Sequence, residues 1–375
     1  MPTSVEVSRE RTSTRLDMAL APIQCCIGSR PHTAGIIFTV KMCAGIPHEH
    51  VWLGLSSGDT GLPASWPSPQ PKRTAGSMLT RRTFLGASLA APLTRLIDTQ
   101  AAPPGKMLLG IHQNTSSAAG YRGSLKGWAR AGIQYVELSD AVLDGFLEND
   151  TLAAAGRVMT HLGLTPVSGQ DVWLPGPARN ASLETWKLRC DQFAQLGLQN
   201  IYCPSITSRA VTSEDFAATP DCIREVGDIA GEYGLTAMIE FLRISTHLAT
   251  LGSALEVIRE AAHPNVRPML DFFHFWSGLS KFEDLDLLEP GELAHAHFQD
   301  LLAGPRELIN NDSRLIPGDG IAPLVRIIQK LVEKRYEGTL SVELFREELV
   351  RGDPFEVATE IGRKCEAVML EAGVL

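Results

Sequence analysis

The sequence predicts an α/β protein whose main part is a closed (β/α)8 barrel. From residue 107 onward, short apolar β-type runs alternate eight times with helix-like segments. The runs lie 25 to 45 residues apart, so they require parallel pairing through crossover connections. Eight such units in roughly 270 residues match a closed barrel, whereas an open doubly wound sheet more often stops at five or six strands. No GxGxxG or Walker loop accompanies them.

The eight expected strands are short runs, each followed by a loop and a helix-like segment. In chain order they are MLLGIH at 107–112, IQYVELS at 133–139, LTPVSG at 164–169, NIYCPS at 200–205, LTAMIEF at 235–241, VRPMLDFFH at 266–274, LAHAHFQD at 293–300 and GTLSVELF at 338–345. The intervening helices are predicted from spacing and end signals.

Residues 181–197 illustrate the helical pattern, because apolar residues recur there every three or four positions. Ser182 is the expected N-cap and Gly197 the expected stop. Segments 322–338 and 353–373 show the same spacing, and the latter begins with Asp353 and Pro354, a cap and first-turn pair.

The chain before the barrel differs in composition. Residues 1–77 show no sustained helical or strand period, and Pro, Ser and Gly become frequent toward residue 77. We expect this part to be a disordered or non-native extension, with a small independent domain as the alternative. The domain organisation expected is therefore this extension at 1–77, a signal segment at 78–102 and the barrel at 106–375.

The signal segment carries a twin-arginine export pattern. Thr80 to Leu85 reads TRRTFL, an Ala-rich apolar run follows, and a small-residue cleavage site lies near TQAA at 99–102. The alternative is an ordinary amphipathic helix that begins with two arginines. The pattern predicts a periplasmic or secreted protein.

Charge limits the kinds of partner. The chain after residue 77 holds 27 Lys and Arg and 38 Asp and Glu, a formal net charge of −11. Such an acidic body repels a phosphate backbone and shows no basic stripe, so we expect no nucleic-acid partner. The chain contains no run of 18 apolar residues, so no membrane span is predicted. A homo-oligomer is left open.

Metal-capable side chains end four consecutive expected strands. They are Glu240, Asp271, His297 and Glu343, with His274 close behind Asp271. Catalytic groups of this fold lie at the C-terminal ends of the strands. Each residue alone could be a buried structural group, but burying four ionisable groups together costs several kcal/mol each without a counter-charge.

A divalent cation would supply that counter-charge. Three carboxylates and one imidazole suit Mn²⁺, Co²⁺, Mg²⁺ or Zn²⁺, of which we favour Mn²⁺ or Co²⁺. His295 lies two residues before His297 and faces the same way.

Further residues are expected near the mouth of the barrel. His112 and Glu137 end strands one and two and either line the pocket or are ordinary strand-end polar groups. Trp173 and Trp276 could stack on a sugar ring or cover the rim. The connection at 301–320 is rich in Gly, Pro, Asn and Asp and could form a lid.

Three stretches resemble a known family. RLIPGDGIAPL at 314–324, YEGTLSVELF at 336–345 and NVRPMLDFFHFWSG at 265–278 are similar to segments of the xylose-isomerase-like barrel superfamily, and within it to inosose isomerases. The resemblance covers residues 107 to 370. Endonuclease IV shares this barrel, but the acidic body and single ligand set argue against that activity.

The resemblance implies a metal set of Glu240, Asp271, His297 and Glu343. It also implies that Glu240 and Glu343 move protons, and that His274 and Arg314 bind a substrate oxygen and hydroxyl.

The expected function is a metal-dependent isomerase or epimerase of a keto-sugar or keto-inositol, working through a metal-stabilised enediolate. One alternative is a lyase or dehydratase that acts on a 3-keto-glycoside or 3-dehydroshikimate-like substrate. The other is a secreted barrel that binds a small carbohydrate or cyclitol without turnover.

The position of the signal yields the first testable prediction. A twin-arginine signal stands near the start of a precursor, so we expect the native precursor to begin at Met78. N-terminal sequencing of the unprocessed protein checks this, and a precursor that begins at Met1 would contradict it.

Overall fold

The structure is a computed structural model that describes residues 105–170 and 183–375. The expected extension at 1–77, the signal segment at 78–102 and Trp173 lie outside the described residues.

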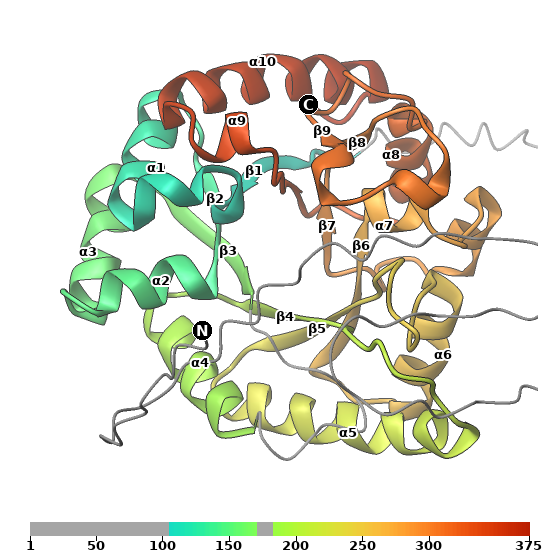
Figure 1. The fold of residues 1–375 in the computed structure, drawn as a ribbon. Coiled ribbons are helices and arrows are strands. Elements are labelled where there is room, and N and C mark those ends of the chain that lie inside the picture. Colours follow the sequence, from blue (N-terminus) through green and yellow to red (C-terminus); the bar gives the residue numbers. More distant parts are fainter. Residues whose placement is uncertain (1–104, 171–182) are drawn as a thin grey trace, which may run out of the picture. The chain divides into compact units, whose positions relative to one another are not determined.

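Eight parallel strands form a closed barrel, which confirms the predicted fold class. Around the barrel their order is β1, β10, β7, β6, β5, β4, β3 and β2, which then returns to β1 (Figure 1). Their bounds are Leu108–His112 for β1, Tyr135–Leu138 for β2, Thr165–Gln170 for β3, Asn200–Pro204 for β4, Thr236–Glu240 for β5, Val266–Asp271 for β6, His295–His297 for β7 and Thr339–Val342 for β10.

The helices lie around the outside of these strands, with one short exception, as Figure 1 shows. They are α1 at Gly120–Arg130, α2 at Asp140–Leu147, α3 at Leu152–Leu162, α4 at Leu183–Gln195, α5 at Ser213–Glu232, α6 at Leu251–Ala261, α7 at Phe272–Ser277, α8 at Leu324–Glu333, α9 at Glu347–Val350 and α10 at Pro354–Ala372. The exception is the short helix α9, which is drawn on the inner side of α10. Short 3-10 helices are η1 at Gln113–Ala119 and η2 at Phe282–Leu287. Among the described helices, none combines the length and apolarity that crossing a bilayer requires.

The predicted end signals at Asp353 and Gly197 are confirmed, whereas the expected N-cap Ser182 lies outside the described residues. Asp353 accepts hydrogen bonds from the backbone N–H groups of Phe355 and Glu356 and so caps α10. Gly197 follows α4 with a φ of 85°, a conformation in which a glycine avoids the steric cost of a Cβ. Local sequence chemistry therefore fixes where α10 begins and where α4 ends.

The sixth strand is shorter than predicted. We expected it to reach His274, but it ends at Asp271 because α7 begins directly afterwards. The Asp271 carboxylate accepts a hydrogen bond from the His274 backbone N–H at 2.7 Å and caps this helix. Helical backbone thus sets the position of the His274 side chain.

A small hairpin interrupts the connection after β7. Strands β8 (Asp300–Leu301) and β9 (Arg314–Leu315) pair antiparallel, with 3-10 helices η3 (Arg306–Leu308) and η4 (Asn311–Ser313) between them. The predicted lid segment at 301–320 therefore contains a hairpin, in which Leu301 pairs with Arg314. Within this region Trp276 packs against a small cluster of Phe273, Leu301 and Ile309.

Asp300 anchors the loop that follows the hairpin. Its Oδ1 accepts from the backbone N–H groups of Leu301 and Ala322 at 2.8 and 2.9 Å, and its Oδ2 from those of Gly318 and Gly320 at 3.1 and 2.9 Å. One buried carboxylate thus satisfies four backbone donors and holds the base of the hairpin.

Two kinds of core support the barrel. The main hydrophobic core includes side chains that strands and helices pack against one another, such as Ile239, Val226 and Phe193. A separate cluster of Tyr202, Met238 and Met269 comes from neighbouring strands. Met238 and Met269 each stand two residues before a predicted ligand, and alternation along a strand points them to the same face. The predicted ligands therefore form the next layer toward the C-terminal ends of the strands.

Close packing at Gly320 gives a stability prediction. A Cβ there would clash with the Leu301 carbonyl oxygen and the Asp300 carboxylate. We expect Gly320→Ala to lower the free energy of unfolding by about 1–3 kcal/mol. Gly362→Ala is the control, because a Cβ at this position of α10 meets nothing within 4 Å. It should be neutral or stabilise by up to about 1 kcal/mol. Urea unfolding measures both, and equal effects would contradict the prediction.

Candidate metal centre

Three of the four predicted ligands are carboxylates, and they converge on the imidazole of the fourth, His297. His297 Nδ1 lies 3.4 Å from Glu240 Oε1, 3.4 Å from Asp271 Oδ2 and 3.5 Å from Glu343 Oε2. Glu240, Asp271 and His297 end β5, β6 and β7, and Glu343 directly follows β10. All four side chains are buried. Residues more than 100 positions apart in sequence thus meet at one end of the barrel.

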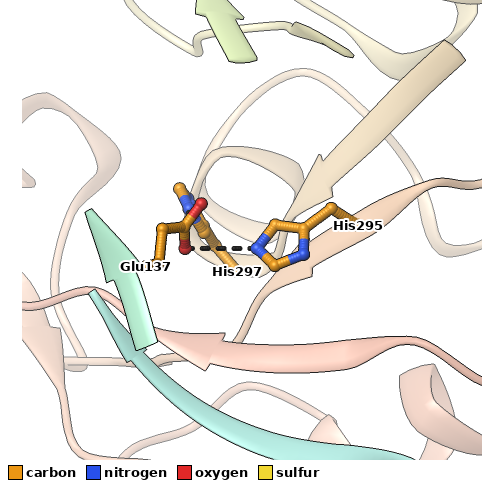
Figure 2. A group of neighbouring side chains, drawn as sticks. All are labelled: Glu137, His295 and His297. Carbon is orange, nitrogen blue, oxygen red and sulfur yellow. Dashed lines mark hydrogen bonds and ion pairs between the residues drawn. The ribbon is translucent and has the colours of Figure 1, made fainter. Parts of the chain in front are cut away.

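A second group lies on the other edge of the His297 ring. Glu137 Oε2 lies 3.2 Å from His297 Nε2 and 3.1 Å from His295 Nε2, and Figure 2 shows its carboxylate between the two rings. The Ser168 hydroxyl donates to the other oxygen, Oε1. We expected Glu137 to line the pocket or to be an ordinary strand-end group. The structure places it fully buried beside the two histidines.

Arg314 supplies a buried positive charge. Its Nη1 donates to Asp271 Oδ2 at 2.7 Å and to Glu343 Oε2 at 3.1 Å, and its Nη2 lies 3.0 Å from His274 Nε2. The guanidinium carbon lies 4.6 Å from the centre of the Phe273 ring and 5.2 Å from that of Phe345. The hairpin therefore brings Arg314 and His274 into the same cluster.

His112 lies at the edge of the cluster. Its Nε2 lies 3.1 Å from the Tyr202 hydroxyl, its Nδ1 accepts from the Asn114 backbone N–H at 3.0 Å, and the same Nδ1 is 3.8 Å from Glu343 Oε1. The ring is completely buried, and this burial lowers the pKa of His112.

Three amide side chains of the site were missed by the sequence analysis. Asn114 Nδ2 donates to Glu343 Oε1 at 3.1 Å and to Gln170 Oε1 at 3.2 Å, and Gln299 Nε2 donates to Asp271 Oδ2 at 2.7 Å. Gln170 could have been found because it ends β3. Asn114 follows its strand within η1 and Gln299 lies past the end of β7, so neither carried a strand-end signal.

The surroundings of Glu240 and Glu343 shift the pKa values of these two glutamates in opposite directions. Burial raises the pKa of Glu240 to about 7, and the charges of Asp271 and Glu343 add to this effect. Burial also acts on Glu343, but His297 and Arg314 outweigh it and lower its pKa. For Asp271 the favourable charge of Arg314 likewise overcomes burial and lowers the pKa.

The donor set fits a divalent cation. Glu240 Oε1 and His297 Nδ1 are buried and have no hydrogen-bond partner, although each faces the other. Buried polar atoms without partners are uncommon and suggest a missing ligand. Three carboxylates and one imidazole are donors that Mn²⁺, Co²⁺, Mg²⁺ and Zn²⁺ accept. The arrangement is therefore compatible with a bound divalent cation.

Comparison with known proteins agrees with the fold. Residues 126–365 match the family described as Xylose isomerase-like TIM barrel, which is more than half of the chain. A crystal structure of the IolI protein with a bound zinc atom has a TM-score of 0.67 at 20% identity, and the match covers 71% of this chain and 99% of that one. At this identity the likeness establishes the fold.

Two curated relatives carry enzyme names. Inosose isomerase from Halalkalibacterium halodurans is 30% identical over 147 residues, which are 39% of this chain and 52% of that protein. 3-Dehydroshikimate dehydratase from Pseudomonas putida is 25% identical over 241 residues, 60% of this chain and 36% of that protein. The chain thus spans about half the length of the first relative and about a third of the second.

The role of Arg314 as a counter-charge for Asp271 and Glu343 can be tested in the metal-free protein. Arg314→Met keeps most of the side-chain volume but leaves Asp271 and Glu343 without their guanidinium partner. We expect the free energy of unfolding to fall by about 3–5 kcal/mol. Arg122→Met removes a largely exposed ion pair with Asp150 and should cost at most about 1 kcal/mol. Denaturant unfolding in EDTA compares the two, and a loss at Arg314 no larger than at Arg122 would refute its role as counter-charge.

Proposed function

Because the chain belongs to the xylose isomerase-like TIM barrel family, we propose that it is a divalent-metal-dependent isomerase or epimerase of a keto-sugar or keto-inositol. The observation that carries this proposal is the convergence of three buried carboxylates on His297 Nδ1. The relative named inosose isomerase supports the choice of substrate class.

Four residues would hold the cation: Glu240, Asp271, His297 and Glu343. When bound, a divalent cation stabilises the negative charge that develops on the oxygens of a carbonyl compound as a neighbouring proton leaves. We favour Mn²⁺ or Co²⁺, while Mg²⁺ and Zn²⁺ also suit this donor set. The zinc atom in the IolI structure supports a divalent ion.

Glu240 and Glu343 are the proposed proton carriers. They stand at the two ends of the arc formed by β5, β6, β7 and β10, so a substrate above His297 would have one carboxylate on each side. One carboxylate removes the proton next to the carbonyl and a carboxylate returns it. The product is an epimer if the proton returns to the opposite face of the same carbon. It is an isomer if the proton returns to the former carbonyl carbon, while the proton of the neighbouring hydroxyl moves to the former carbonyl oxygen and that hydroxyl becomes the new carbonyl.

Nitrogen donors beside the carboxylates would orient the substrate. Arg314 Nε and His274 Nδ1 are buried without a hydrogen-bond partner, and the partly exposed Asn114 amide contacts Glu343. These groups suit the hydroxyl and carbonyl oxygens of a sugar or cyclitol. The proposed ligand is therefore a small polyhydroxylated ketone.

Elimination is the second candidate reaction. The dehydratase relative aligns over 241 residues, a longer stretch than the 147 residues of the isomerase relative. The first step is the same, because a proton next to a carbonyl is removed, but a leaving group then departs instead of a proton returning. A 3-keto-glycoside or a 3-dehydroshikimate-like compound would suit this outcome.

We also propose export through the twin-arginine route, supported by the TRRTFL pattern at 80–85. This route moves folded proteins, and a ligand set drawn from four separate strands is assembled only on folding. The cation could then be loaded before export.

Proton exchange in D₂O tests the reaction. Protein loaded with Mn²⁺, Co²⁺, Mg²⁺ or Zn²⁺ is incubated with inososes, ketohexoses, 3-keto-glycosides and 3-dehydroshikimate, and NMR follows each carbon next to the carbonyl. We expect deuterium uptake with an intact carbon skeleton. Loss of a substituent would favour the elimination reaction. Tight binding of one compound without exchange in any metal form would instead indicate a sugar-binding barrel and refute the proposal.

Variants test the two carboxylates. Glu240→Gln and Glu343→Gln should each lower kcat by at least about 100-fold, because an amide cannot accept the proton. EDTA treatment of the wild type should abolish turnover, and restoring the cation should recover it. Glu148→Gln changes an exposed carboxylate at the end of α2 and is the matched control. Full activity in both active-site variants would refute their proposed role.

A further inference from the structure

We infer that Glu137 is a positioning residue that fixes the His297 ring and so gives the site its affinity for a divalent cation. The inference rests on the proposed function, since it assumes that His297 holds the cation. It differs from our expectation that Glu137 contacts substrate or is an ordinary strand-end group. Two features carry it, namely which atoms of the two histidines meet Glu137 and how completely Glu137 is enclosed.

The hydrogen bond to Glu137 determines which nitrogen of His297 can bind a cation. A carboxylate oxygen only accepts, so His297 Nε2 must carry the hydrogen that it donates across 3.2 Å to Glu137 Oε2. In the neutral ring the lone pair then lies on Nδ1. That nitrogen is the atom that faces Glu240, Asp271 and Glu343 at 3.4–3.5 Å. Glu137 thus selects the tautomer that points a free electron pair at the carboxylates.

Glu137 reaches this position across the barrel. It belongs to β2, and β1 and β10 separate that strand from β7, which carries His297. Two further residues hold the Glu137 carboxylate. His295 Nε2 lies 3.1 Å from Oε2, and the Ser168 hydroxyl donates to Oε1. Figure 2 shows the carboxylate between the two imidazole rings. A carboxylate fixed in this way has little freedom to let the His297 ring turn.

Charge adds to the effect of orientation. Both oxygens of Glu137 accept hydrogen bonds, from Ser168 and from the two histidines, which is the pattern of an ionised carboxylate. An ionised carboxylate on Nε2 increases the electron density of the ring and strengthens Nδ1 as a ligand. Both consequences of the contact favour cation binding.

Two other roles for Glu137 fit the structure less well. Substrate contact requires an oxygen without a partner, whereas both oxygens of Glu137 already accept hydrogen bonds, from Ser168 and from the two histidines. A second cation between Glu137, His295 and His297 is the other possibility, since their donor atoms lie within 4.8 Å of one another. That arrangement would displace the hydrogen from His297 Nε2, so the two readings predict different results.

Cation titration of the full chain tests the inference. Wild type and Glu137→Gln are freed of metal, and isothermal titration with Co²⁺ alone measures the stoichiometry and Kd. We expect one equivalent in the wild type and a Kd about 10- to 100-fold higher in Glu137→Gln. The visible Co²⁺ spectrum should change as the His297 nitrogen is held less firmly. Glu148→Gln removes one exposed carboxylate in the same manner and should keep the wild-type Kd.

The outcomes separate this inference from the proposed function. If the wild type binds no divalent cation, the proposed function fails. If the wild type binds Co²⁺ and Glu137→Gln binds it equally well, the positioning role alone is refuted. Two equivalents in the wild type, with one lost in Glu137→Gln, would replace the positioning role with a second cation site.

A second measurement needs no variant at Glu137 and covers the case in which that protein does not fold. Nitrogen-15 NMR of histidine-labelled, Zn²⁺-loaded wild type reports which ring nitrogen carries the hydrogen, and a His297→Asn sample assigns the signals. We expect a protonated Nε2 in His297. A hydrogen on Nδ1 would overturn the inference.

Discussion

The structure depends on how the barrel accommodates negative charge at one end. Glu240, Asp271 and Glu343 are buried within a few ångströms of His297 Nδ1, and burying ionised groups is costly unless positive charge compensates for it. Arg314 and His297 provide that charge in the described structure, and the proposed cation would provide more. The pKa values of the three carboxylates move in different directions because each has a different share of this compensation.

Arg314 and the proposed cation would share the same oxygens. Asp271 Oδ2 and Glu343 Oε2 accept from Arg314, and the same two atoms lie 3.4 and 3.5 Å from His297 Nδ1. A bound cation would therefore relieve Arg314 of part of its role as counter-charge and leave its donors available to a substrate. Because Arg314 belongs to the hairpin after β7, such an exchange would link this hairpin to the state of the proposed metal site. Three backbone hydrogen bonds to Asp300 hold the loop after the hairpin, and a fourth comes from Leu301 in β8.

Much of the fold and part of the site could be predicted from local sequence. Strand and helix alternation identified the eight barrel strands, and the end signals at Gly197 and Asp353 were read correctly. The strand-end rule selected Glu240, Asp271, His297 and Glu343 because parallel strands of a barrel all end on one face. The strand-end rule was less informative where a strand passes directly into a helix or where a site residue lies beyond a strand end. Helix α7 shortened the sixth strand, and Asn114 and Gln299 lie outside strand ends, so periodicity could not identify them.

The sequence by itself determined which strands form and which polar residues stand at their ends, because alternation and turn chemistry are local properties. The tertiary structure decided which of those residues meet. Glu137 and His297 are 160 positions apart, and the barrel brings a strand-two carboxylate to the far edge of a strand-seven imidazole. Arg314 reaches Asp271 through a hairpin whose register no sequence pattern specified. Such contacts depend on closing the barrel and packing its interior, and these are properties of the whole fold.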